Sequence, residues 1–373
     1  MSHRVRLGMV GGGQGAFIGA VHRIASRIDD RFELVAGALS STAEKAAASA
    51  KELGIAPDRS YADFREMAKA EAAREDGIEA VSIVTPNHMH ADPAIAFLEA
   101  GIHVICDKPL TVSMEEAERV RAAVEASSAK FVLTHNYTGY PLIRQARQMI
   151  ERGDLGTIRV IQARYAQDWL AEAPEEDNKQ AAWRTDPKRA GGGGAIGDIG
   201  THALNLATFV TGLEPEALLA DLESFVPGRA VDDNAHILLR MKGGAKGMLW
   251  ASQVAVGKEN GLTLGVFGDK GGIEWDQENP NYLTFTRFGE PRQIITRGGA
   301  GLGGGAGDWT RVPPGHPEGY LEGFANVYTD AADLIRGKGD GALLPGIDAG
   351  LEGMWFIEAC IESSRNGGTW VKR

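Results

Sequence analysis

The sequence predicts an α/β protein in two parts: a doubly wound parallel sheet, then an α+β part built on a large, open, mostly antiparallel sheet. Three observations support this fold class. Strand-like and helix-like segments alternate over the first third of the chain, as they do in parallel sheets. Beyond residue 217, strand-like segments follow one another without helices between them, which is typical of antiparallel pairing. The chain has 373 residues, a length that suits two domains at roughly 150 residues each.

The first part is a regular succession of short buried strands and helices. Apolar runs predict strands at residues 5–10, 32–39, 80–84, 103–106 and 131–134. Helical patterns predict helices at residues 18–27, 42–53, 61–74, 93–100 and 114–127. Ser41 or Thr42 and Ser113 are suitable N-caps, because a hydroxyl can accept from the first backbone N–H groups of a helix.

The second part begins near residue 140, so we expect domains at residues 1–139 and 140–373. It opens with helices at residues 141–152 and 195–210 around a strand at residues 158–166. The series of strands covers residues 218–225, 236–240, 247–254, 262–268, 272–275, 282–287 and 293–296. Residues 297–319 are rich in Gly and Pro and predict a loop. Two closing helices, at residues 318–336 and 347–366, are expected to pack back on the first domain.

The composition excludes several functional classes. The chain has 39 Lys and Arg against 50 Asp and Glu, a net charge of −11, which is unsuited to phosphate backbones and anionic membrane surfaces. No apolar run approaches the roughly 18 residues of a membrane helix, and the N-terminus lacks the pattern of a signal peptide. Cys106 and Cys360 cannot build a disulfide framework. We therefore expect a cytoplasmic protein without nucleic-acid or membrane partners.

A glycine-rich loop follows the first predicted strand. Gly11, Gly13 and Ala16 satisfy the pattern G-x-G-x-x-G/A between a strand and a helix. In that place glycines permit a tight turn, and the N-terminus of the helix attracts a pyrophosphate. The motif predicts a dinucleotide site in a Rossmann-type sheet; a turn that is merely rich in glycine is the competing interpretation.

The end of the second strand, where such sheets bind the adenosine ribose, carries Ser40, Ser41 and Thr42. It offers no acid for the ribose hydroxyls and no Arg for a 2′-phosphate, and the nearest cation is Lys45. Because no guanidinium fork is present, we expect NAD, with NADP not excluded. The competing interpretation is that these residues only cap the next helix.

Two further patterns carry candidate chemistry. Lys108 lies at the mouth of the parallel sheet between Asp107 and Pro109, where a desolvated lysine beside a cationic ring can have a lowered pKa. Asp198 and His202 are four residues apart and share one helix face, so the carboxylate can hold the imidazole for acid–base work. The competing interpretations are a surface lysine paired with Asp107 and an ordinary Asp–His helix pair.

His88 and His90 have a spacing found among metal ligands. A zinc site needs three or four convergent ligands, so we predict no metal site.

Four motifs together resemble the Gfo/Idh/MocA oxidoreductases: GGGQG after the first strand, TPNHMH, CDKP and GGGAIGDIGTHALNL. The resemblance covers essentially the whole chain and is greatest to inositol and aldose dehydrogenases, such as scyllo-inositol dehydrogenases. It implies that Lys108, Asp198 and His202 carry catalysis on a cyclic polyol or sugar, with His202 as general acid/base. Lys108 would bond the reacting oxygen and the nicotinamide ribose, and Asp198 would orient both. The chain departs from the family in its longer glycine loop and in Ser40, where an acid is frequent.

We accordingly predict two sets of site residues. The cofactor-binding set is Gly11, Gly13, Gly15, Ala16, Phe17, Ile18, Ser40, Ser41, Thr85, Pro86, Asn87, His90, Asp107, Lys108, Asn136, Trp183 and Arg184. The substrate-binding set is Lys108, Tyr137, Asp168, Arg184, Asp198, His202 and His316.

Two other functional classes compete with a dehydrogenase. A redox-neutral glycosidase or lyase keeps its NAD, so it shows no net release of NADH. A non-catalytic sensor of sugars or nucleotides has no need of Lys108, Asp198 and His202 together, and their presence argues against it.

The predicted open sheet suggests a homo-oligomer. A sheet face carrying Trp250, Val254, Val266 and Trp275 would leave a large apolar patch on a monomer, so we expect a dimer or, with a second axis, a tetramer. Residues 297–319, the arm, are too rich in glycine to hold themselves together. We expect either a disordered tip or an arm that brings His316 to the substrate of a neighbouring subunit.

Overall fold

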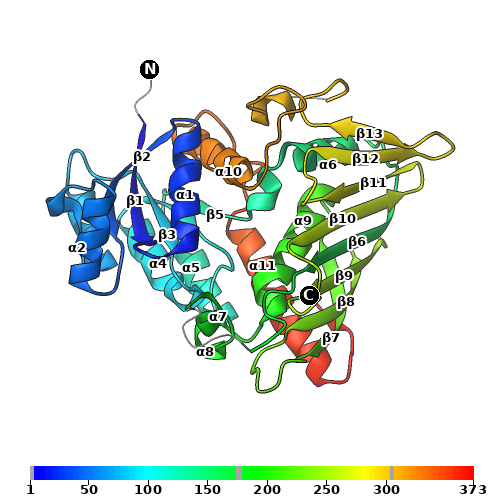
Figure 1. Cartoon of the computed structure of the whole chain (residues 1–373), viewed down its shortest axis with the longest axis horizontal. Coiled ribbons are helices and arrows are strands. Elements are labelled where there is room, and N and C mark those ends of the chain that lie inside the picture. The colour runs from blue at the N-terminus through cyan, green and yellow to red at the C-terminus, as the bar shows by residue number, and fades with distance from the viewer. Residues whose placement is uncertain (1–3, 174–178, 303–305) are drawn as a thin grey trace. The chain divides into compact units, whose positions relative to one another are not determined.

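The computed structural model describes residues 4–173, 179–302 and 306–373. The contacts divide the chain into two compact units, and each is described by itself (Figure 1). The N-terminal unit comprises Met1–Asn136 and Tyr320–Glu352, and the C-terminal unit comprises Tyr137–Gly319 and Gly353–Arg373. The structure does not describe residues 1–3, at the N-terminus, or residues 303–305, which belong to the arm. Among the described helices, none combines the length and apolar character needed to cross a bilayer.

The N-terminal unit is a doubly wound parallel sheet, as predicted. Its five strands lie in the order β2-β1-β3-β4-β5, and every pairing is parallel. Their bounds are β1 (Val5–Gly11), β2 (Phe32–Ala38), β3 (Ala80–Val84), β4 (His103–Cys106) and β5 (Phe131–Leu133). All residues of β3 are buried, because helices cover both faces of the sheet.

The helices of this unit alternate with its strands. They are α1 (Phe17–Ile28), α2 (Ala43–Glu52), α3 (Phe64–Ala72), α4 (Ala91–Glu99), α5 (Met114–Ala126) and the late helix α10 (Tyr320–Ile335). The predicted cap Ser113 accepts from the N–H of Glu116. Thr42 occupies the cap position of α2 but makes no side-chain bond there.

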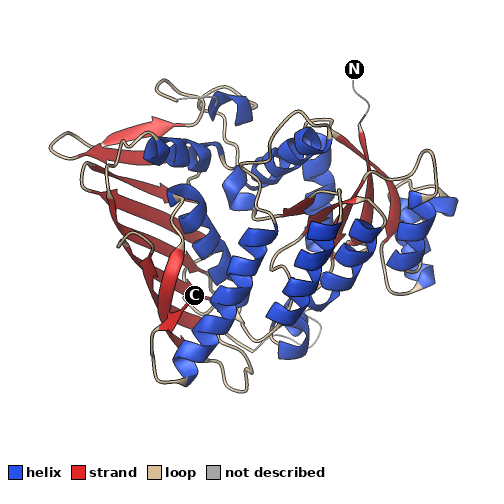
Figure 2. Cartoon of the chain, turned by 180° about the vertical axis from the view of Figure 1, so that it is seen from behind, coloured by secondary structure: helices blue, strands red, loops and turns tan. Residues whose placement is uncertain are grey.

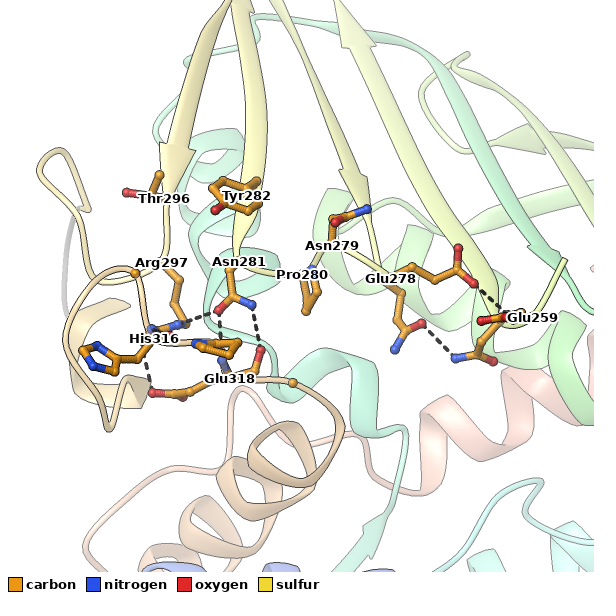
Figure 3. Close-up of a pocket in the computed structure, with 15 residues that line it drawn as sticks. Glu259, Glu278, Asn279, Pro280, Asn281, Tyr282, Thr296, Arg297, His316 and Glu318 are labelled. Atoms are coloured by element: carbon orange, nitrogen blue, oxygen red, sulfur yellow. Dashed lines mark hydrogen bonds and ion pairs between the residues drawn. The ribbon is translucent and has the colours of Figure 1, made fainter.

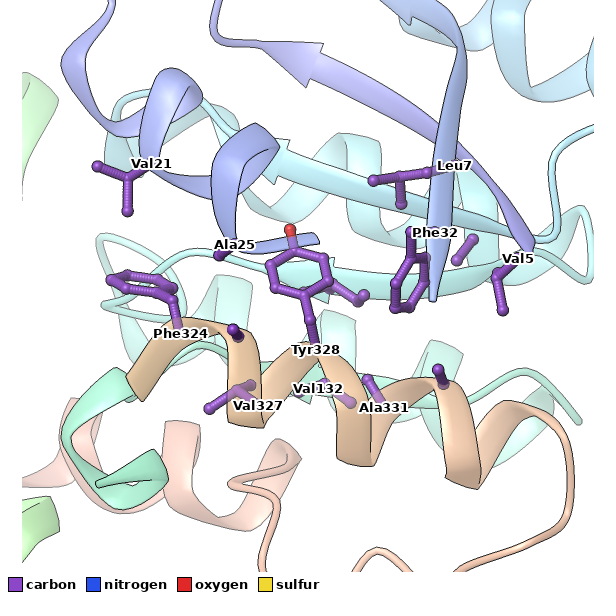
Figure 4. Close-up of a cluster of buried hydrophobic side chains, with 14 residues drawn as sticks. Val5, Leu7, Val21, Ala25, Phe32, Val132, Phe324, Val327, Tyr328 and Ala331 are labelled. Carbon is purple, nitrogen blue, oxygen red and sulfur yellow. The ribbon is translucent and has the colours of Figure 1, made fainter. Parts of the chain in front are cut away.

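Helices α1 and α10 pack together over one face of the parallel sheet (Figure 1). Leu7 points into the buried cluster that they share, whereas a Cβ on the next residue, Gly8, would lie 2.4 Å from Met67 of α3. Successive residues of a strand point to opposite faces, so α3 lies on the other side. Figure 4 shows Phe324 and Tyr328 of α10 in the cluster with Leu7 and Phe32. A segment from late in the sequence therefore completes this core.

The C-terminal unit contains a nine-stranded sheet in the order β13-β12-β11-β10-β6-β9-β8-β7-β14. Among the described strands of this nine-stranded sheet, only β6 and β9 pair in parallel. The bounds are β6 (Ile158–Ala166), β7 (Pro215–Glu223), β8 (Asn234–Met241), β9 (Lys246–Ser252), β10 (Gly261–Gly268), β11 (Gly271–Asp276), β12 (Tyr282–Arg287), β13 (Gln293–Thr296) and β14 (Val371–Lys372). The predicted mostly antiparallel sheet is confirmed.

Helices cover one face of this sheet and leave the other open (Figure 2). They are α6 (Pro141–Glu151), α9 (Thr201–Thr211) and the second half of α11 (Ile347–Arg365). Helix α9 packs on β6, β9 and β10 and also against α6, so nearly all of its residues are buried. The short helices α7 (Lys179–Arg184) and α8 (Pro187–Ala190) and the strand β14 were not predicted.

The predicted composition of the open face is partly wrong. Val266 and Trp275 are buried, at 0% and 3% exposure, because their positions in β10 and β11 point towards the helices. Val254 lies beyond the end of β9. Trp250 is half-buried. The apolar side chains that are exposed on these strands are Val160, Leu238, Met248, Tyr282 and Ile294.

The described part of the arm is held by one buried side chain, which corrects the expectation that it cannot hold itself together. Arg297 is 3% exposed and its guanidinium donates to Asn281, Glu318 and the backbone carbonyls of residues 312, 313 and 316. The Glu318 carboxylate also accepts from the N–H groups of Arg311 and Val312. Figure 3 shows this group around Arg297. The predicted loop also contains a 3-10 turn, Ala306–Trp309.

Candidate functional site

The glycine loop of the N-terminal unit has a backbone that larger residues do not adopt readily. Gly11, Gly12 and Gly15 have φ angles of 79°, 72° and 76°. A Cβ on Gly13 would lie 2.6 Å from the carbonyl oxygen of Leu39. The loop therefore presses against the end of β2, and glycine at position 13 is required by space.

The close crossing of loop and helix is made by a glycine that the motif did not identify. A Cβ on Gly19 would lie 2.4 Å from Cα of Gly12. The sequence pattern gave the third position to Ala16, but Ala16 is the N-cap of α1. The extra length of the loop explains the shift, because it moves the helix start and brings the next turn of α1 against the loop.

The N-terminus of α1, directly after the glycine loop, is the candidate anion-binding position. Three N–H groups of the loop are already used: Gly13 donates to Leu39, Gln14 to Ser49 and Ala16 to Gly13. The cap residue Ala16 has no side-chain acceptor for the first N–H groups of the helix. The N–H groups of Phe17 and Ile18 therefore point out of the helix N-terminus, where a phosphate is stabilised.

The end of β2 leaves the choice of cofactor open. Ser40 is half-buried and its Oγ lies 3.5 Å from the N–H of Thr42, while Ser41 is exposed. The serines therefore remain the candidate residues for the adenosine ribose at this strand end.

The loop after β3 is fixed by bonds within the protein. The Thr85 hydroxyl donates to the carbonyl of Met89, and Pro86 and the buried Asn87 lie between them. His90 is 1% exposed, and its two ring nitrogens lie 2.8 Å from the carbonyl oxygens of Thr85 and Pro109. We therefore revise the prediction for His90, which links two strand-end loops and has no ring nitrogen left for a cofactor.

Lys108 follows β4 and is half-buried at the sheet edge. One carboxylate oxygen of Asp107 accepts from the backbone N–H of Lys108 and from the hydroxyl of Thr134, each at 3.0 Å. Burial and the nearby Lys108 charge lower the pKa of His135 to about 3. Asp107 thus organises the backbone around Lys108, and His135 is a neutral neighbour.

Asn136 offers a hydrogen-bond donor that the described protein does not use. It is 2% exposed, and its Nδ2 has no partner among the described residues. A buried amide donor without an acceptor is costly, which favours a ligand at this position. The glycine loop, the start of α1 and Asn136 together fit a dinucleotide with an amide-bearing ring.

Asp198 lies in the C-terminal unit, on a π turn that runs into α9. The turn spans Ile196–Gly200, and α9 starts at Thr201. Asp198 Oδ2 is 3.3 Å from Nε of Arg184 and accepts a 2.9 Å bond from Gln253. Gln253 is buried and follows β9 directly. The sequence carried no sign of Gln253, because its contact with Asp198 arises only from the sheet.

His202 is enclosed by two tyrosines. Its ring is 4.9 Å from that of Tyr137 in an edge-on arrangement and 6.1 Å from that of Tyr165. The two phenol oxygens are 2.6 Å apart, and Tyr165 donates to Asn260 at 2.7 Å. Burial raises the pKa of Tyr137, so the phenol stays neutral. The imidazole, 7% exposed, is thereby held in a fixed orientation.

Arg184 has the indole rings of two tryptophans near its guanidinium. Its guanidinium carbon is 4.2 Å from the ring centre of Trp183 and 5.8 Å from that of Trp169. The Trp169 indole is itself tied to Gln167 by a 3.0 Å bond. Asp168 is less available than predicted, because one carboxylate oxygen accepts from the N–H of Gly257.

A carboxylate from a distant loop caps the segment that carries Asp198 and His202. Asp232 accepts from the N–H groups of Gly194 and Ile196, at 2.6 and 2.9 Å. A Cβ on Gly194 would lie 2.0 Å from the carbonyl oxygen of Asp232. Burial raises the pKa of Asp232 to about 6. A cap of this kind is worth about 1 kcal/mol and fixes the start of the helix.

His316 is exposed and lines a separate cavity of about 870 Å³, beside Asn281, Arg297 and Glu318 (Figure 3). Its role in substrate binding stays a prediction. In the parts of the chain that the structure describes, no three His, Cys, Asp or Glu side chains converge as a metal site requires.

The glycine loop and the strand ends of the N-terminal unit are those of a dinucleotide-binding protein, and the C-terminal unit carries a carboxylate and an imidazole one helical turn apart, at Asp198 and His202. Residues 5–135 match an oxidoreductase family with an NAD-binding Rossmann fold, and residues 143–274 match the GFO/IDH/MocA C-terminal domain. The chain belongs to the Gfo/Idh/MocA family of oxidoreductases, and its N-terminal unit is that family's NAD-binding Rossmann domain.

Three similar proteins place the chain within this family. An oxidoreductase from Sinorhizobium meliloti is 57% identical, with a TM-score of 0.91 over 99% of both chains. An inositol dehydrogenase homologue from Azotobacter vinelandii, solved with NADH and myo-inositol, is 39% identical, with a TM-score of 0.93 over 100% of this chain and 98% of that one. Levoglucosan dehydrogenase from Pseudarthrobacter phenanthrenivorans is 31% identical over 75% of each sequence.

Proposed function

We propose that the protein is an NAD-dependent dehydrogenase that oxidises a secondary hydroxyl of a neutral cyclic polyol or sugar, of the inositol or aldose type. The observation that carries the proposal is the environment of α9. Asp198 is bound there by Arg184 and Gln253, and His202 is enclosed by Tyr137 and Tyr165. The similarity to proteins named for inositol and levoglucosan supports the same substrate class.

The chemistry needs one hydride acceptor and one proton acceptor. Bound NAD would be held by the glycine loop and the start of α1 and would supply the hydride acceptor. The imidazole of His202 takes the hydroxyl proton, since an imidazole is the side chain best suited to general acid–base work near neutral pH. The ammonium of Lys108 donates a hydrogen bond to the same oxygen and favours its deprotonated form. The Asp198 carboxylate is held by Arg184 and Gln253, and we assign it the orienting role that the family resemblance implies.

The charge balance around Asp198 favours a neutral substrate. The guanidinium of Arg184 has the Asp198 carboxylate at 3.3 Å, so the pair contributes little net charge. The phenol rings of Tyr137 and Tyr165 lie against His202, and their hydroxyls continue to the amide of Asn260. Hydroxyl-rich ligands are bound by such groups, and indole rings such as those of Trp169 and Trp183 cover their apolar faces.

The test is a substrate panel with direct measurement of NADH. The purified protein is incubated with NAD or NADP and with inositols, aldoses, an anhydrosugar and aryl glycosides, and absorbance at the NADH band is followed. We expect one NADH for each molecule of an inositol or aldose oxidised. Glycoside cleavage without net NADH would establish the redox-neutral alternative instead, and absence of turnover with every polyol and sugar would overturn the proposal.

A further inference from the structure

Four polar side chains of the N-terminal unit, three from β3, α10 and α1 and one from the loop after β4, form a series that ends at Asp107, the residue before Lys108. Ser82 of β3 is hydrogen-bonded to the phenol of Tyr328 in α10. The same phenol oxygen lies 2.9 Å from Nδ1 of His22 in α1. Nε2 of His22 lies 4.0 Å from a carboxylate oxygen of Asp107. Ser82, Tyr328 and His22 are at most 1% exposed, so water does not compete for these groups. Figure 4 shows the Tyr328 ring inside the core.

The charge state of His22 limits the ways in which these protons can be arranged. Burial lowers the pKa of His22 to about 4, with Asp107 opposing and Arg23 adding to that effect. The imidazole is therefore neutral near pH 7 and carries a single N–H. If that proton were on Nδ1, the lone pair of Nε2 would face the Asp107 carboxylate, which is electrostatically unfavourable at 4 Å in a buried site.

The other tautomer avoids this repulsion. With the proton on Nε2, the N–H faces the Asp107 carboxylate, and Nδ1 accepts from the Tyr328 hydroxyl. The Tyr328 oxygen then accepts from Ser82. Nε2 has no hydrogen-bond partner among the described residues, so the attraction to Asp107 is its main interaction.

We propose that His22 and Tyr328 are positioning residues for Lys108, acting through the Asp107 carboxylate. The oxygen of Asp107 that His22 faces is the one that accepts from the Lys108 N–H and the Thr134 hydroxyl. His22 also lies on α1, the helix whose start is offered to the cofactor. The series thus connects the cofactor helix with the backbone of Lys108. This proposal rests on the role given to Lys108 in the proposed function.

The first test measures the tautomer and needs no activity. The imidazole nitrogens of the NAD-loaded protein are observed by ¹⁵N NMR near pH 7.5, and the His22 signals are identified by their loss in His22→Gln. We expect the proton on Nε2 in the wild type and a mixture of tautomers in Tyr328→Phe. A proton on Nδ1 in the wild type would overturn the proposal.

The second test separates positioning from packing. In Tyr328→Phe we expect the amide signal of Lys108 to move and kcat to fall about tenfold, less than the roughly 100-fold cost of a 1 Å misplacement. The substrate KM stays within about twofold. His22→Gln, which keeps a donor at the Nε2 position, retains more activity than His22→Leu. Tyr61→Phe is the matched control, since its phenol donates to Glu71 in the same unit.

Each outcome decides between the proposals. If Tyr328→Phe is folded and leaves both kcat and the Lys108 amide signal as in Tyr61→Phe, His22 and Tyr328 only fill the core. If the protein oxidises no polyol or sugar but the tautomer and the amide shift are as expected, the positioning network stands and the proposed function fails.

Discussion

The two units assemble their candidate residues in different ways. In the N-terminal unit these residues lie in short stretches directly after strands, such as Gly11–Ile18 after β1 and Asp107–Lys108 after β4. In the C-terminal unit, the partners of Asp198 and His202 come from positions as distant as 137, 165, 184 and 253. The first arrangement depends on local loops and the second on a correctly formed sheet. Mutations far from α9 in sequence are therefore expected to affect His202 more readily than comparable ones affect Lys108.

The largest expected effect tests the contribution of the N-terminal unit to chemistry. Lys108→Met is expected to abolish turnover while the fold persists, because the reacting oxygen loses its cationic donor. Lys108→Arg does not restore turnover, since a planar guanidinium cannot replace a point ammonium. Steady-state kinetics and NAD titration by fluorescence check both variants. Turnover restored by Arg would reduce Lys108 to a simple charge partner.

The corresponding test of the C-terminal unit concerns the proton acceptor. His202→Ala is expected to lower kcat by about 10² to 10⁴, the usual contribution of general acid–base catalysis. NAD affinity changes little, since the glycine loop belongs to the other unit. Kinetics with the best substrate of the panel measure the effect. A variant with wild-type kcat would show that another group accepts the proton.

Gln253 tests the dependence on distant residues directly. Gln253→Leu removes the 2.9 Å bond to the Asp198 carboxylate and is expected to lower kcat roughly 10- to 100-fold, because a hydrogen bond to a charged group contributes about 1.5–3 kcal/mol. Gln162→Leu, an exposed position on β6, is the control. Equal kcat values in the two variants would mean that the sheet does not position Asp198.

Gly19 tests the local arrangement of the glycine loop. In Gly19→Ala the new Cβ meets Cα of Gly12, so we expect weaker NAD binding and a loss of about 1–3 kcal/mol in the free energy of unfolding. Gly307→Ala, where a Cβ meets nothing within 4 Å, is the matched control. Calorimetry and NAD titration compare the two. An unchanged NAD Kd in Gly19→Ala would show that the close approach of Gly19 to Gly12 is not needed for NAD binding.

The smallest expected effect is a dependence of stability on pH. The pKa values of His22 and His135 are lowered to about 4 and about 3 in the folded protein. As the pH falls below 6.5, the two histidines take up protons in the unfolded chain but stay neutral in the folded protein. The free energy of unfolding therefore falls with pH, by at most about 1.4 kcal/mol per pH unit for each histidine. Denaturant titrations at several pH values should give a shallower slope for His135→Gln. A slope for His135→Gln equal to that of the wild type would show that His135 does not contribute to the pH dependence.

The sequence predicted most of the fold because hydrophobic alternation is a local property. Every strand of the parallel sheet starts where its apolar run starts, and the glycine motif lies between β1 and α1. The face of the sheet to which a side chain points was harder to predict. Val266 and Trp275 are apolar, but that property alone does not tell whether helices cover their face of the sheet. The sequence also did not indicate the roles of Gly19, Gln253 and Arg297, because the residues that they contact come near only in the folded chain. His90 is a residue type that often binds ligands, but both of its ring nitrogens face backbone carbonyl oxygens of the protein.

The return of α10 to the N-terminal unit has a consequence for biosynthesis. Phe324, Tyr328 and Ala332 complete a core whose other members, such as Leu7 and Phe32, lie in the first half of the chain. The ribosome releases Ala332 nearly 200 residues after the parallel sheet ends at Leu133, which at about 5–20 residues per second takes roughly 10 to 40 s. During that interval the nascent sheet exposes an uncovered apolar face. The unit whose synthesis begins first therefore completes its core only after most of the chain has left the ribosome.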